Sequence, residues 1–172
     1  VNLTANWDNG GGADNFYNYD AVRFDDSSSV GGVDTFEPVI PASVVISNDT
    51  TAYVLSGAGR ISGAGTVTIA GPGTAAISLT TDYTGLTTVN DGVLKAGHVL
   101  AFGATNAGVT VSGTGTLDLN DLFLGSEAVT ISGAGASGQG ALINSVPSVT
   151  ATRGLRFLTL AGDATVGGAG WF

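Results

Sequence analysis

Short runs of alternating apolar and small polar residues follow one another along most of the chain, separated by glycine or by Asx-Gly turns. The pattern is clearest over residues 61–103, where Val67, Ile69 and Val89 alternate with Thr, Ser, Ala or Gly. Each run is too short for a stable helix, and a period of two is typical of β-strands. The pattern therefore predicts an all-β protein built from many short strands.

These strands recur along the chain with a period of about 20 to 22 residues. The segments VTVSG (109–113) and VTISG (129–133) match at one such interval, and Val67 and Val89 are separated by another. A coil of this length, with two or three strands, is typical of a β-solenoid, in which each coil pairs with its neighbours at about 4.8 Å. We predict seven or eight coils, which make a rod on the order of 35 Å long.

The first 43 residues differ from the rest and are predicted to form an N-terminal cap with the first coil. Six of the 13 aromatic residues lie before residue 37, among Asn, Asp and Gly residues that favour turns. Large aromatic side chains suit a plug over the open end of a solenoid. A strand is predicted at 21–24, and the regular strands begin at 44–46 and 53–55. Residues 44–172 are predicted to form the remaining coils of a single domain.

The net charge of -9 is concentrated near the N-terminus, where residues 1–53 contain eight acidic residues against Arg23 alone. This charge would repel phosphate backbones and anionic lipids, so neither nucleic acid nor membrane insertion is expected. The chain has no Cys and no Met. We therefore expect that Val1 follows a processing event such as removal of a secretion signal, and that the protein is extracellular or displayed on a cell surface.

One stretch resembles a known family. The segment YTGLTTVNDGVL (83–94), followed by LAFG (100–103), is similar to the autotransporter-associated β-strand repeat, also called the passenger-associated transport repeat. The upstream GPGT (71–74) resembles the strand that precedes this repeat, whereas Leu86 and Asp91 stand where the repeat has Gly. The resemblance covers about residues 5–120. It implies a right-handed parallel β-helix in a secreted or surface-displayed bacterial protein.

Candidate catalytic residues are few. His98 is the only His and Lys95 the only Lys, and neither lies in a recognisable catalytic motif. Arg153 and Arg156 have no acidic neighbours in sequence and fit a solvated strand. We therefore predict no catalytic residues and no enzyme activity. A polysaccharide-cleaving β-helix enzyme, the alternative, would need at least two carboxylates and Lys95 or Arg153 in one groove.

The N-terminal segment also supplies oxygen ligands for a cation. Asp14, Asp20, Asp25 and Asp26 form a candidate calcium site, the one cofactor that the sequence suggests. The alternative interpretation is that these residues form turns, because their spacing matches no known calcium motif.

The two ends of the chain suggest how the molecule associates. The C-terminal GGAGWF (167–172) places Trp171 and Phe172 on a glycine tether, and together with Trp7 they are predicted to form subunit contacts. An uncapped solenoid end favours head-to-tail addition of further copies. We therefore predict a structural protein that assembles with itself into an extracellular filament or surface layer. The alternative is an autotransporter passenger fragment acting as an adhesin for a glycan or a surface protein.

Overall fold

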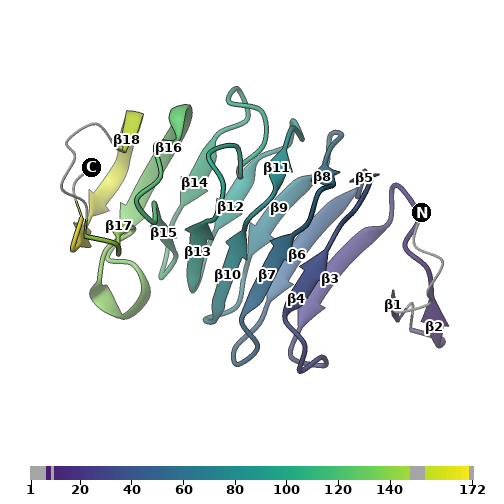
Figure 1. Cartoon of the computed structure of the whole chain (residues 1–172). Helices are drawn as coiled ribbons and strands as arrows, with labels where there is room; N and C mark the ends of the chain where they lie inside the picture. Colours follow the sequence, from purple (N-terminus) through teal and green to yellow (C-terminus); the bar gives the residue numbers. More distant parts are fainter. Residues whose placement is uncertain (1–6, 9, 148–153, 171–172) are drawn as a thin grey trace.

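A computed structural model describes residues 7–8, 10–147 and 154–170 and shows an all-β chain whose parallel sheets stack as a β-solenoid of about six turns (Figure 1). The prediction of an all-β solenoid is confirmed. Across the described residues, the one helical element is the 3₁₀ turn Ala136–Gly138, and no helix is long and apolar enough to cross a membrane. The right-handed coiling implied by the family resemblance stays a prediction.

Two seven-stranded parallel sheets form the walls of the solenoid. We call them the β3–β18 sheet and the β4–β19 sheet. The first contains β3 (Ala21–Asp25), β6 (Ser43–Ser47), β9 (Thr66–Ile69), β12 (Thr87–Val89), β14 (Val109–Val111), β16 (Gly125–Gly133) and β18 (Leu155–Ala164). The second contains β4 (Gly32–Asp34), β7 (Tyr53–Ser56), β10 (Thr74–Ile77), β13 (Val93–Ala96), β15 (Thr116–Asp118), β17 (Leu142–Asn144) and β19 (Val166–Gly168).

Two smaller sheets complete the fold. A third parallel sheet joins β5 (Pro38–Val39), β8 (Arg60–Ile61) and β11 (Thr80–Thr81) along the N-terminal half of the solenoid. The strands β1 (Trp7–Asp8) and β2 (Ala13–Asp14) form a short antiparallel hairpin beyond β3, at the N-terminal end of the stack (Figure 1). Because β3 already pairs in parallel with β6, residues 21–43 make the first coil. Within the described residues, the irregular cap is therefore limited to 7–20.

The register of the β3–β18 sheet shows how the coils are spaced. One inward-facing column runs through Val22, Val44, Val67, Thr87, Val109, Val129 and Leu158. The predicted match of the segments at 109 and 129 is confirmed, because Val109 pairs with Val129. The predicted alignment of Val67 with Val89 is wrong, because Val67 pairs with Thr87 and Val89 lies opposite Ile69.

The coil count is also smaller than predicted. The last step of the column, from Val129 to Leu158, uses a longer stretch of chain than any earlier step, and residues 7–20 add a cap rather than a coil. The chain therefore makes about six turns instead of seven or eight. At about 4.8 Å per turn, the rod is roughly 30 Å long.

The core lies between the two long sheets and continues through most of the stack. A second inward column contains Ile46, Ile69, Val89, Val111 and Ile131, which are all buried. The corners between strands are tight. Gly92 has a φ of +62°, and a Cβ at this position would collide with backbone of the preceding coil at Gly73. Glycine is required there because it alone tolerates both the positive φ and the close approach.

Candidate binding site at the N-terminal end

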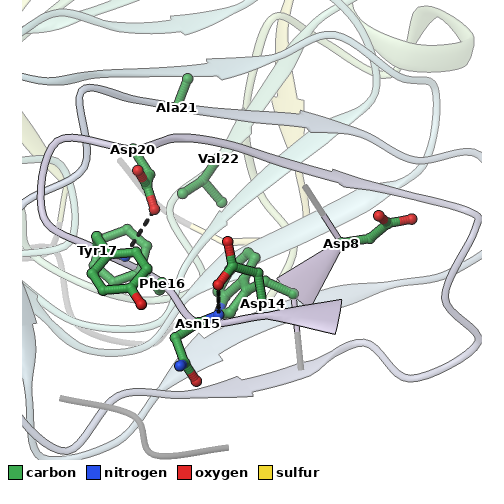
Figure 2. A pocket seen from close by; sticks show the side chains of 9 residues that line it. Asp8, Asp14, Asn15, Phe16, Tyr17, Asp20, Ala21 and Val22 are labelled. Atoms are coloured by element: carbon green, nitrogen blue, oxygen red, sulfur yellow. Dashed lines mark hydrogen bonds between the residues drawn. The ribbon is translucent and has the colours of Figure 1, made fainter. Parts of the chain in front are cut away.

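A cavity of about 300 Å³ lies between the β1–β2 hairpin and strand β3 (Figure 2). It is located where the cap meets the first coil, at the N-terminal end of the β3–β18 sheet. Its lining combines aromatic rings with carboxylates and one side-chain amide. The lining residues are Trp7, Asp8, Asp14, Asn15, Phe16, Tyr17, Asp20, Ala21 and Val22.

Local turns position the acidic side chains. The amide of Gly10 donates to Oδ1 of Asp8 at 2.8 Å, and Gly10 has a φ of +82°, so a tight turn follows β1. The amide of Tyr17 donates to Oδ2 of Asp20 at 2.8 Å, and the amide of Asp20 donates to the Tyr17 carbonyl at 3.1 Å. Asp and Asn favour such side-chain-to-backbone turns. These turns hold Asp8 and Asp20 at the cavity.

Aromatic packing attaches the cap to the first coil. The Trp7 ring lies 6.0 Å from Phe16 and 5.6 Å from Phe24, centroid to centroid. Phe24 in turn lies 5.2 Å from Tyr53 of the next coil. Tilted rings at these separations attract one another beyond the area that they bury. The aromatic plug predicted for this end is therefore continuous with the solenoid core.

The cavity is electronegative. Asp8, Asp14 and Asp20 line it, and none of the lining residues that the structure describes is basic. The nearby Arg23 pairs with Asp25 at 3.1 Å instead. A cavity of this kind favours cations and hydrogen-bond donors and repels anions.

One side-chain atom at this site lacks a hydrogen-bond partner. Oδ1 of Asn15 is buried and accepts no hydrogen bond, although the backbone amide of Asn15 donates to Oδ1 of Asp14 at 2.7 Å. A buried oxygen without a donor is costly.

The four carboxylates of the predicted calcium site have different environments. Asp14 and Asp20 line the cavity, but Asp25 and Asp26 do not. Oxygens of Asp26 accept backbone hydrogen bonds from Asp49, Thr50 and Thr51 at 2.6, 3.0 and 2.8 Å. These bonds, Thr51 foremost, lower the pKa of Asp26 to about 2. Across the described residues, no three His or acidic side chains gather as ligands for one ion.

Asp25 closes the turn after β3. Its Oδ1 accepts the Ser27 amide at 3.0 Å, and hydrogen bonds from Ser27, followed by Arg23, lower the pKa of the Asp25 carboxyl. The Tyr53 hydroxyl donates to the Asp25 carbonyl at 2.6 Å. The surroundings of Asp25 and Asp26 thus fit the alternative interpretation, in which these residues hold turns between coils. The calcium site itself stays a prediction.

Of the three residues predicted to form subunit contacts, the structure describes Trp7 alone. Trp7 is half-buried and packs against Phe16 and Phe24 of its own chain. Trp171 and Phe172 lie outside the described residues. A contact role for these three residues stays a prediction.

The other candidate residues are scattered. Nζ of Lys95 lies 4.0 Å from Oδ2 of Asp118 in the next coil, and Asp118 also accepts hydrogen bonds from Ser145. Nδ1 of His98 accepts the Leu100 amide at 3.0 Å and so forms part of a turn. Neither Lys95 nor His98 lines the cavity. Arg153 lies outside the described residues.

A second notable region lies at the opposite end of the solenoid. None of the site residues predicted from the sequence belongs to it. Strand β18 pairs with β16 on one side, and none of the strands in the described part of the chain pairs with its other edge. Its side chains are largely exposed, including Phe157 at 58% and Leu160 at 63%. Leu158 and Leu160 occupy the columns of Val129 and Ile131, which are buried one coil earlier. The alternation in LRFLTL (155–160) is the signal that could have found this face.

Comparison with known proteins identifies no relative of this chain: no family model, no curated protein and no solved structure matches it. The fold and the two end faces therefore define the class of protein. It is a parallel β-solenoid with a cavity-bearing cap at its N-terminal end and an apolar face at its C-terminal end.

Proposed function

We propose that this protein is a structural subunit without catalytic activity, secreted by a bacterium, which assembles head to tail into an extracellular filament or surface layer. The resemblance of residues 83–103 to the autotransporter-associated repeat supports secretion and surface display. The observation that carries the proposal is the open face at β18, where inward core columns end on exposed leucines.

The open face favours association because the buried columns of the core end there on exposed side chains. Leu158 and Leu160 continue two buried columns, yet both are exposed. The β18 edge also carries backbone groups that can pair with another strand. Covering apolar area contributes about 25 cal/mol per Å², so further protein placed on this face would stabilise it.

Exposed apolar side chains also occur at the N-terminal end of the solenoid. Val30 and Phe36 of the first coil are largely exposed, Phe36 at 78%. Two unlike faces at opposite ends of one rod make a heterologous contact, which repeats without closing when the rods are coaxial. A filament is the assembly that such a contact produces.

The test combines sedimentation velocity with negative-stain microscopy. The unmodified chain should form thin filaments whose length increases with concentration. A Leu158→Asp/Leu160→Asp variant should remain monomeric, because it places two charges on the open face. Val99→Asp is the matched control, since Val99 is exposed in a turn at mid-rod and should leave assembly unchanged. A chain that stays monomeric at every concentration would contradict the proposal.

The adhesin alternative has its own supporting observation, the N-terminal cavity. Aromatic rings and carboxylates, which line this cavity, are groups that hold sugar hydroxyls in protein sites. The exposed Tyr19 side chain lies close to the cavity in sequence. In this case Tyr19→Ala should abolish binding to immobilised glycans or to a surface protein and leave filament formation intact.

A further inference from the structure

The cavity and one exposed arginine lie near the same lateral edge of the β3–β18 sheet, at its two opposite ends. Register links Val22 of β3, coil by coil, to Leu158 of β18. Asp20 stands two residues before Val22, and Arg156 stands two residues before Leu158, within an irregular step of the ladder between Leu155, opposite Gly125, and Phe157, opposite Ala128. In two copies stacked along a common axis, Arg156 of one copy would therefore lie at the same edge of the sheet as the cavity of the next copy, which the β1–β2 hairpin and β3 border.

The charges at the two positions are complementary. Arg156 is exposed and forms no ion pair with any residue that the structure describes, whereas Arg23, Arg60 and Lys95 each lie within 4.0 Å of an Asp. Arg156 is also one of only five basic residues in the sequence. At the other end, three carboxylates line a cavity whose described residues include no basic one. An acidic receptor and an unpaired guanidinium thus lie on the two faces that would meet.

We infer that the partner of the N-terminal cavity is a second copy of this chain, and that the guanidinium of Arg156 enters the cavity and binds Asp20 and its neighbouring carboxylates. This inference rests on the proposed head-to-tail assembly and adds the contact that fixes its direction. The exposed leucines beside Arg156 would cover the rim of the cavity in the same joint.

The chemistry of the cavity suits a guanidinium. Its planar donors match carboxylate oxygens, and its faces stack on aromatic rings such as Tyr17. One backbone amide each for Asp8 and Asp20 uses only part of the acceptor capacity of a carboxylate. Apolar cover over the pair would exclude water and strengthen the attraction.

A charge-swap experiment tests the contact. Arg156→Glu and Asp20→Arg should each weaken self-association by at least tenfold in sedimentation velocity, because each places like charges at the joint. An equimolar mixture of the two variants should assemble, since each bears the end that the other needs. The Arg156→Glu/Asp20→Arg double variant should also assemble alone.

The controls separate this inference from the proposed function. Arg60→Glu changes an exposed arginine in the second coil, which belongs to neither proposed contact, and should leave assembly unchanged. Asp20→Asn keeps an acceptor for the Tyr17 amide but removes the charge, so it should weaken assembly without unfolding the cap, as checked by thermal melting. If both single variants assemble like the unmodified chain, the Arg156 contact is wrong and the head-to-tail proposal stands. If the unmodified chain never assembles, both are wrong.

Discussion

Glu127 is the most unusual single residue in the solenoid. Its side chain is 4% exposed, on the inward face of β16, and Oε1 has no hydrogen-bond partner. Burial raises the pKa of this carboxyl from 4.5 to about 7. A buried carboxyl without a partner is stable only when it carries its proton.

Stability should therefore depend on pH through this residue. In the unfolded chain Glu127 ionises near 4.5, and in the folded chain near 7. Its contribution is most favourable below pH 4.5 and should fall by about 1.4 kcal/mol per pH unit as pH rises toward 7. Thermal melting of the unmodified chain and of Glu127→Gln across this range measures the difference.

Asp163→Asn, an exposed acid on β18, is the control and should leave the pH dependence intact. Asp26 does not interfere, because its lowered pKa confines its effect to pH below about 4. An equal pH slope for Glu127→Gln and the unmodified chain would refute this role.

Tyr83 and Thr87 form a buried pair of hydroxyl groups. The Tyr83 hydroxyl and Oγ1 of Thr87 lie 2.6 Å apart, and both residues are fully buried. Tyr83→Phe or Thr87→Val alone leaves one buried hydroxyl unpaired and should cost about 1–3 kcal/mol. The double variant should cost less than the sum of the two, because it removes both polar groups. Urea unfolding in a double-mutant cycle measures the coupling, and additive costs would contradict it.

The same pair illustrates which part of the fold could be predicted from the sequence and which part could not. Alternation of apolar and small residues identified the strands, because inward positions are mostly Val, Ile or Leu. The alignment slipped by two positions at Val67 because its true partner, Thr87, is a polar residue facing inward. The hydroxyl of Thr87 is satisfied only by its contact with the Tyr83 hydroxyl in the folded chain. A slip of two positions keeps every side chain on its own face, so the pattern itself could not reveal the error.

At the scale of strands, burial predicts that truncating a side chain costs less stability at the C-terminal end of a core column than in its middle. Ile69 is fully buried between neighbouring coils, whereas Leu160, which continues the same column in the last strand, is exposed. Ile69→Ala should cost about 2–5 kcal/mol, and Leu160→Ala well under about 1 kcal/mol in the monomer. Urea unfolding at low protein concentration provides the comparison. Equal costs would show that the last coil is packed as tightly as the middle ones.

The candidate site was less accessible to sequence reasoning than the strands. The acidic, aromatic character of the N-terminal segment was visible, and Asp14 and Asp20 do share a cavity. Asp25 and Asp26 do not join them, because a strand and a turn carry these carboxylates to a different coil corner. Sequence distance could not separate the two pairs. The placement of Arg156 near the same sheet edge as the cavity depends on the register of every strand pair in the sheet, which no single motif encodes.

At the scale of the whole molecule, charge and end faces act together. The N-terminal end is strongly acidic, and Arg156 stands at the C-terminal end. Assembly should therefore weaken as the salt concentration rises, because salt screens the attraction between the charges of the two end faces while these are still exposed to solvent. Sedimentation at low and high sodium chloride measures this effect. Assembly that strengthens with salt would indicate a joint dominated by apolar contact.

The stacking of coils also has a mechanical consequence. Each coil pairs only with the coil before it and the coil after it, through parallel strands in register. A pull on the two ends of a filament would be borne by these ladders in series, and the weakest coil would detach first. Each detached coil of about 20 residues would release roughly 70 Å of extended chain. Such a rod would lengthen in steps under load, as an extensible tether does, before it broke.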